Sequence, residues 1–168
     1  MPLSEALVQE FDYEMAITRK FLERVPESKL AWQPHTKSMP MGRLAGHLAE
    51  LSAWGTLTLE NDSFDLQPPG APPYKPFDPA SRQEILDLFD QNVSNSHQAL
   101  TAASDEQLQA PWSLLMTGNS VFTMPRAAVL RTMVLNHCIH HRAQLGVYLR
   151  LNDIAVPSTY GPSADEQM

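Results

Sequence analysis

The sequence predicts an all-α protein, a four-helix bundle with long crossover connections. Three observations favour this class: four long segments carry apolar residues at helical spacing, no segment alternates convincingly as a strand, and a proline-rich stretch separates the second helix from the third. The chain of 168 residues is long enough to bury one substantial core. We therefore expect a single bundle domain over residues 1–168.

The first helix is expected over residues 4–24, where the apolar stripe includes Leu7, Phe11 and Leu22. Pro26 follows and cannot continue a helix, because it lacks a backbone donor. The segment therefore has a defined end.

The second helix is expected over residues 41–60, and His47 lies within its apolar stripe, next to Leu48. Residues 62–79 then form a long connection rich in proline, including the sequence Pro68-Pro69-Gly70. This connection is long enough to cross the bundle.

The third helix is expected to start after Ser81 and to run to about residue 103. Ser81 and Glu84 have the spacing of a capping box, in which each side chain binds a free amide of the first turn. Residues 104–123 are expected to be mostly loop, with one short helical turn near residues 105–108.

The last helix is expected over residues 125–151. Thr123 is the expected N-cap, and Pro125 is tolerated in a first turn. Asn152 and Asp153 then end the helix.

Composition excludes several classes of protein. A formal net charge of −7 argues against a nucleic-acid partner, and 43% hydrophobic with 18% charged residues is typical of a folded globular chain. Cys138 is the single cysteine, so no intrachain disulfide exists. No run of 18 apolar residues and no signal-peptide pattern occurs, which predicts a cytoplasmic protein with no membrane partner.

A pair of histidines in the last helix is the best indication of function. His137 and His141 are four residues apart, so their rings lie on one helical face and can reach one ion. His47 enters the same interior from the second helix. Three imidazole nitrogens would leave the fourth position of a tetrahedral ion open, as in a catalytic site. Imidazole binds zinc, nickel, iron and copper alike, so the ligand types alone do not choose the ion. Zinc or nickel is the expected ion, with iron or manganese as further options.

A purely structural role is the alternative for the histidines and their neighbours. A histidine on an apolar face is commonly a hydrogen-bonded core residue, and His140 points about 60° to the other side of His137, where it could replace one ligand or support a ligand from outside. Glu50, one turn after His47, could orient a ligand or donate a carboxylate, but exposure to solvent is the expected position. Cys138 fits a buried inert thiol better than a nucleophile.

The remaining histidines have surface positions. His35 lies in a polar connection, and His97 falls on the solvent side of the third helix. We expect neither at a metal.

Several segments together resemble the DinB family, in its DinB/YfiT-like branch. The matching segments are Gly46-His47-Leu48-Ala49-Glu50, residues 137–145, residues 148–150, residues 156–166 and residues 25–35. The resemblance implies a four-helix bundle, often dimeric, with a divalent metal on three histidines. Carried onto this chain, the metal ligands are His47, His137 and His141.

The resemblance also implies two reaction types, a thiol S-transferase that uses a low-molecular-weight thiol as co-substrate and a hydrolase, both acting on a small molecule. Some relatives are similar to maleylpyruvate isomerase. The chain shows no evident catalytic acid or base, although Tyr160, Asp165 and Glu166 are candidates for reaching a pocket mouth. The native metal and the substrate are not determined by the sequence.

The alternative function is that of a non-catalytic, metal-binding stress-response protein that forms dimers. The last helix is apolar almost all round, with Leu135, Ile139 and Leu149 on the side away from His137. Such a helix has apolar side chains on two faces, and both must be buried against other parts of the structure. We therefore expect a homodimer under either function.

Overall fold

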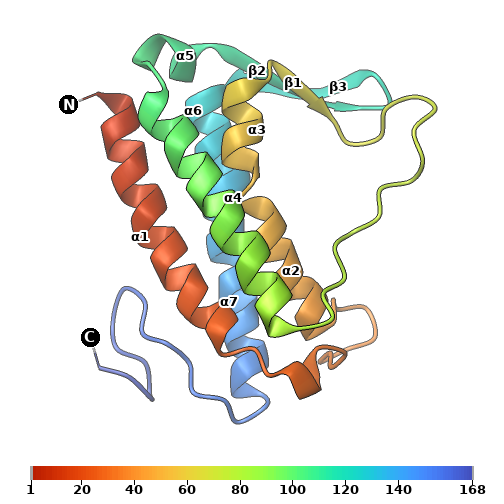
Figure 1. Ribbon diagram of the computed structural model, residues 1–168, viewed down its shortest axis with the longest axis vertical. Helices are drawn as coiled ribbons and strands as arrows, with labels where there is room; N and C mark the ends of the chain where they lie inside the picture. The colour runs from red at the N-terminus through yellow and green to blue at the C-terminus, as the bar shows by residue number, and fades with distance from the viewer. Residues whose placement is uncertain (1, 168) are drawn as a thin grey trace.

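The computed structural model describes residues 2–167 and shows a bundle of long helices with a small sheet at one end (Figure 1). The helices are α1 (Leu3–Glu23), α2 (Met41–Leu51), α3 (Trp54–Glu60), α4 (Arg82–Ala102), α5 (Asp105–Gln109), α6 (Arg126–Val129) and α7 (His137–Arg150). A 3₁₀ turn, η1 (Glu27–Lys29), and a π-helical segment, η2 (Leu130–Asn136), complete the helical elements. The strands are β1 (Ser63–Asp65), β2 (Pro111–Met116) and β3 (Asn119–Pro125).

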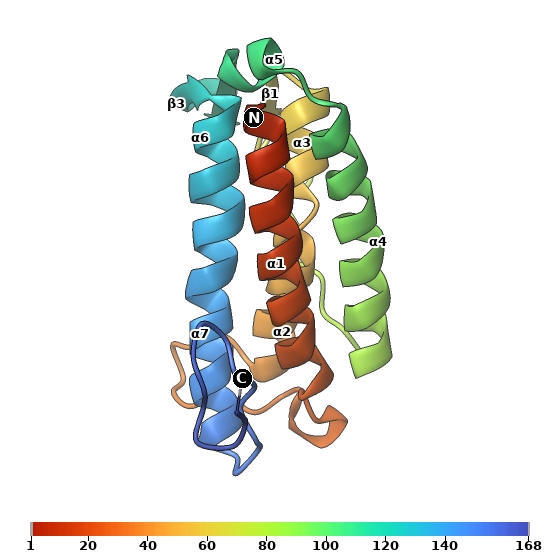
Figure 2. The same cartoon turned by 90° about the vertical axis from the view of Figure 1, so that its left-hand side faces the viewer.

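The long helices pack in pairs. Helix α1 contacts α4 and α7, and α2 contacts α4 and α7 on the other side of the core. Figure 2 shows α1 between α4 and the continuous column of α6, η2 and α7. The core that these helices share includes fully buried Leu22, Leu48, Ile85 and Leu145. Burial of each such side chain stabilises the folded state by roughly 1.5–3 kcal/mol relative to leaving it exposed.

The sheet corrects the expectation of an all-α fold. Strand β2 pairs with β3 in an antiparallel hairpin and with β1 in parallel. The hairpin turn is Thr117-Gly118, with φ values of 53° and 78°, and the carboxylate of Asp65 accepts hydrogen bonds from both turn amides. Positive φ at both central residues is the geometry that matches the twist of a two-residue hairpin. Residues 104–123 were expected to be mostly loop, but most of them lie in β2 and β3.

The signal for the hairpin was a short alternation. Trp112 and Leu114 are buried on one face of β2, with Ser113 between them, and they form a second core cluster with Val129. The alternation is brief and flanked by Pro111, which made it weak evidence for a strand.

The second helix is broken rather than continuous. Helix α2 ends at Leu51, and α3 begins at Trp54 after a turn. Side chains of α4 satisfy the carbonyls freed at this break: Asn92 donates to Ala49 O, and Ser96 Oγ donates to Ser52 O at 2.6 Å. The break depends on partners from a distant segment, so local periodicity did not indicate it.

The helix starts were predicted with mixed success. Ser81 caps α4, because its Oγ accepts from the amide of Glu84, while the Glu84 carboxylate accepts from the amide of Ala80. Thr123 is not an N-cap, which corrects the prediction. It lies in β3 and shares a hydrogen bond with Ser113 across the hairpin, and Pro125 is the N-cap of α6.

The proline-rich connection runs outside the bundle from the sheet to the start of α4, and the C-terminal segment folds back beside α7 at the opposite end from the sheet (Figure 1). No helix among residues 2–167 has the length and hydropathy needed to span a membrane.

Candidate metal centre

Three imidazoles from two helices converge between α2 and α7. His47 comes from α2, and His137 and His141 come from successive turns of α7. One nitrogen of each ring lies within 4.8 Å of the others. The rings of His47 and His141 have centroids 4.7 Å apart, and His141 is buried while the other two are half-buried. The structure thus brings together all three histidines chosen from the sequence.

The hydrogen bonds of α7 define which nitrogens face inward. Nδ1 of His141 lies 2.7 Å from Oε1 of Gln144. An amide oxygen only accepts, so Nδ1 donates and Nε2 keeps its lone pair. Nε2 of His141 lies 3.0 Å from Nε2 of His137. The ring of His137 in turn hydrogen-bonds to the backbone of Met133.

This arrangement fits a divalent cation. Two nitrogens with lone pairs directed at each other at 3.0 Å need a proton or a cation between them. Nitrogens bound at about 2.0–2.1 Å to a tetrahedral ion are separated by about 3.3 Å, close to the observed distance. Among residues 2–167, no cysteine or carboxylate joins the three imidazoles in the cluster. The donor set therefore supplies three nitrogens and leaves further positions open.

Burial keeps two of the imidazoles neutral. Burial is the largest influence on the pKa of His141 and, with the neighbouring histidines, lowers it to about 4, although the hydrogen bond that His141 donates to Gln144 opposes this shift. Burial likewise lowers the pKa of His137, and the charge of His47 adds to this effect. Neutral imidazoles bind metals, so both rings are ready to bind near pH 7.

The π-helical segment lies directly before His137. In a π-helix each amide bonds five residues back rather than four, which alters where carbonyls are available. The segment covers Met133, the residue whose backbone meets the ring of His137. Sequence periodicity did not show this feature, because Leu130–Asn136 has an ordinary helical composition.

Glu50 lies at the outer side of the cluster. Its Oε2 is 3.7 Å from Nδ1 of His47 and 2.8 Å from the guanidinium of Arg43, and its side chain is only 19% exposed. Burial raises the pKa of Glu50, but the neighbouring His47 ring and the hydrogen bond from Tyr74 outweigh this and bring the pKa down to about 2. The expectation that Glu50 lies in solvent is therefore wrong.

The other candidates do not join the three-imidazole cluster. His140 is exposed, with its ring centroid 4.9 Å from that of His141. His35 is exposed, and His97 binds Asp12 on the surface. Burial raises the pKa of Cys138 to about 12, which makes it an inert thiol.

The C-terminal candidates form a different structure. Tyr160 hydrogen-bonds to the buried ion pair of Glu14 and Arg142. Asp165 pairs with Arg150, and Glu166 pairs with Arg24. These contacts fasten the tail to α1 and α7.

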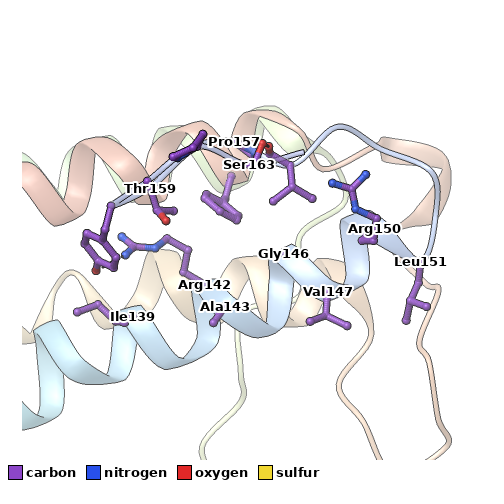
Figure 3. Close-up of a pocket in the computed structure, with 15 residues that line it drawn as sticks. Ile139, Arg142, Ala143, Gly146, Val147, Arg150, Leu151, Pro157, Thr159 and Ser163 are labelled. Carbon is purple, nitrogen blue, oxygen red and sulfur yellow. Dashed lines mark hydrogen bonds between the residues drawn. The ribbon is translucent and has the colours of Figure 1, made fainter. Parts of the chain in front are cut away.

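A cavity of about 460 Å³ lies beneath this tail (Figure 3). Its walls are mainly apolar, and Arg142 and Arg150 project into it. It is lined by Ile139, Ala143 and Gly146, which lie on the face of α7 opposite His137 and His141. The imidazoles do not line this cavity, so it is separate from the candidate metal centre.

A helical bundle in which three imidazoles converge between two helices is an arrangement that can hold a metal ion in its interior. The chain belongs to the DinB superfamily, whose family model matches residues 10–145.

Relatives support this membership. YrdA of Bacillus subtilis (strain 168) is 29% identical over 160 residues, which cover 95% of this chain and 89% of YrdA. The crystal structure of a DinB-like protein from Bacillus cereus ATCC 10987 has a TM-score of 0.69 and 24% identity, and the match covers 93% of this chain and 97% of that one.

A third similar structure is YfiT from Bacillus subtilis, which is described as "a probable metal-dependent hydrolase with an unusual four-helix bundle topology". It has a TM-score of 0.69 at 14% identity, and the match covers 90% of this chain and 89% of YfiT. At these identities the two structures establish the shared fold.

Proposed function

We propose that this protein is a divalent-metal-dependent enzyme that acts on a small molecule, with His47, His137 and His141 as the metal ligands. The observation that carries the proposal is the facing pair of Nε2 atoms 3.0 Å apart, with His47 beside them. The description of YfiT as a metal-dependent hydrolase points in the same direction. Zinc or nickel is the proposed ion.

We also propose that the fold is a four-helix bundle with one long crossover connection. The four members are α1, the broken helix α2–α3, α4 and the column of α6 to α7. The connection of residues 61–81 is the long crossover.

The residues of the chain define what the site can do. Three imidazole nitrogens would hold a divalent ion without cancelling its charge, and the half-buried rings of His47 and His137 leave the site accessible from solvent. A divalent ion in such a site lowers the pKa of a bound water or thiol and so supplies a nucleophile near neutral pH. Water as nucleophile gives a hydrolase, and a small thiol gives an S-transferase.

His140 is the titratable side chain at the solvent side of His141. Its exposed ring lies beside that of His141, with 4.9 Å between the centroids, so it stands between the candidate site and solvent. A role for His140 in either reaction is part of the proposal.

Metal analysis tests the ligand assignment. Purified wild-type protein is expected to contain one divalent ion, and His47→Ala, His137→Ala and His141→Ala are expected to lose most of it. His97→Ala is the matched control, because that histidine binds Asp12 on the surface. Full metal retention by all three site variants contradicts the proposal.

Cobalt substitution separates the two reaction types. If a small thiol binds the metal, titration with glutathione or cysteine is expected to add a thiolate-to-cobalt band to the visible spectrum. A band together with turnover of a thiol-acceptor pair supports the transferase. Turnover of esters or amides without thiol, and without a band, supports the hydrolase. A protein that binds metal but turns over neither class supports the non-catalytic alternative.

A further inference from the structure

We propose that Glu50 is a positioning residue, which holds the ring of His47 toward the metal centre and couples it to the proline-rich connection of residues 61–81. The inference rests on the proposed function, because it takes His47 as a ligand.

The two oxygens of Glu50 serve different parts of the protein. Oε1 accepts a hydrogen bond from the hydroxyl of Tyr74 at 2.6 Å and one from the amide of Phe77 at 2.9 Å. Oε2 faces the guanidinium of Arg43 at 2.8 Å and Nδ1 of His47 at 3.7 Å. One carboxylate thus joins the connection to the helix that bears His47.

Close packing holds the connection in this position. A Cβ atom on Gly46 would lie 3.1 Å from the ring of Phe77 and 3.3 Å from Pro79, so only glycine lets the connection approach this turn of α2 without displacement. Phe77 also packs against the main core. Gly46 directly precedes His47, so the connection contacts the same helical turn that carries the imidazole.

The position of the carboxylate selects one tautomer of His47. Negative charge beside Nδ1 favours a proton on that nitrogen, which leaves the lone pair of Nε2 for a metal. At 3.7 Å the carboxylate acts by electrostatic attraction for the N–H dipole rather than by a full hydrogen bond. Gln144 has the corresponding role for His141, at the same spacing of three residues. Each of these two ligands therefore has its own acceptor one turn further along its helix.

A charge-removing variant tests this role. In Glu50→Gln the amide oxygen can still accept from Tyr74 and Phe77, but the negative charge beside His47 is lost. Mutation of a residue that hydrogen-bonds a metal-bound histidine from outside typically lowers metal affinity by about 10–100-fold. We expect Glu50→Gln to weaken binding of Zn²⁺ and Co²⁺ by such a factor, measured by competition with a chromogenic chelator.

Glu84→Gln is the matched control. The carboxylate of Glu84 accepts from the amide of Ala80, three residues beyond Phe77 in the same connection, and Glu84 is exposed on α4. Like Glu50→Gln, this variant removes one carboxylate charge and keeps an amide oxygen that can accept from the connection, but the change lies away from His47. Its metal affinity is expected to stay close to that of the wild type. An equal loss of affinity in both variants would mean that the loss of any carboxylate charge at the connection has this effect, and would overturn the proposal.

The tautomer gives a second test that needs no variant. Long-range ¹H–¹⁵N NMR spectra of metal-free wild-type protein are expected to show His47 protonated at Nδ1. Protonation at Nε2 instead, or unchanged metal affinity in a folded Glu50→Gln protein, contradicts the positioning role. These outcomes leave the proposed function intact as long as the wild type binds metal. Failure of the wild type to bind metal is the separate result that would contradict the proposed function.

Discussion

At the scale of single residues, the histidines of the cluster are fixed by acceptors from their own helices. Gln144 holds Nδ1 of His141, the backbone of Met133 meets the ring of His137, and Glu50 lies beside His47. These partners direct Nε2 inward and limit rotation of the rings. A site held in this way loses little entropy when an ion binds.

The low pKa of His141 predicts a pH dependence of stability in metal-free protein. The folded value of about 4 lies below the ordinary value of 6.5, so the unfolded chain binds more protons between these pH values. The contribution of His141 to the free energy of unfolding is therefore fully present above pH 6.5 and is lost as the pH falls toward 4. Urea unfolding in EDTA at several pH values measures this loss.

His141→Gln removes the titrating group and is expected to show a shallower fall in unfolding free energy across the same pH range. His35→Gln, in an exposed connection, is the control and should keep the wild-type slope. Identical slopes for all three proteins would contradict the prediction.

A second residue-scale prediction concerns the buried ion pair of Glu14 and Arg142. Their side chains are 7% and 3% exposed and lie 2.8 Å apart. Glu14→Ala leaves a buried guanidinium without its partner, which typically costs about 3–5 kcal/mol. We expect a loss of this order in the free energy of unfolding from urea titration.

Asp90→Ala is the matched control for the ion pair, because it breaks the exposed pair with Arg19, whose side chain is 41% exposed. Exposed pairs contribute about 0.2–1 kcal/mol. Equal effects of the two substitutions would show that the buried pair has no special role.

At the scale of elements, the break between α2 and α3 depends on α4. Ser96 of α4 donates to Ser52 O and also accepts from the amide of Thr56. The helices approach closely here, because a Cβ on Gly55 would lie only 2.6 Å from Ser96. One glycine and one serine therefore fix the packing of α3 on α4.

Gly55→Ala is expected to destabilise the protein by about 1–3 kcal/mol, since the added methyl group overpacks the contact and displaces the Ser96 hydroxyl. Thermal unfolding monitored by circular dichroism measures the effect. Gly161→Ala is the control, because no atom lies within 4 Å of a Cβ there. A Gly55→Ala protein as stable as the wild type would show that the two helices can separate freely.

At the scale of the whole molecule, the two faces of α7 have different surroundings. One face carries His137 and His141 toward α2, and the other lies under the C-terminal tail around the cavity (Figure 3). Much of the apolar surface that suggested a partner subunit is covered by the chain itself, since Leu135 and Leu149 are buried. Val147 stays 58% exposed.

The homodimer stays a prediction, now resting on the exposed apolar residues at the end of α7. Leu151 is also 58% exposed, and it lies beside Val147 at the rim of the tail cavity. Sedimentation equilibrium at micromolar concentrations is expected to give twice the chain mass of 18.8 kDa. Val147→Asp should then shift the protein toward monomer. A wild-type monomer at all concentrations contradicts the prediction.

Sequence by itself determined the long helices and the histidine cluster. Apolar spacing located α1, α4 and the column of α6 to α7, because burial of one face imposes a repeat that the local chain displays. The cluster followed from His137 and His141 sharing a helical face and from His47 lying in another buried stripe. Ser81 was predicted correctly as the N-cap of α4, because capping also depends on residues that are close in sequence.

Tertiary structure alone decided the hairpin, the helix break, the π-helical turn and the place of Glu50. The hairpin turn, the break and the position of Glu50 depend on partners far along the chain: Asp65 for the hairpin turn, Ser96 for the break, and the proline-rich connection for Glu50. No local pattern records such a contact. The hydrogen bond from Tyr160 to Glu14, which fastens the tail over the cavity, is likewise a product of chain folding, because it joins residues 146 apart in the sequence.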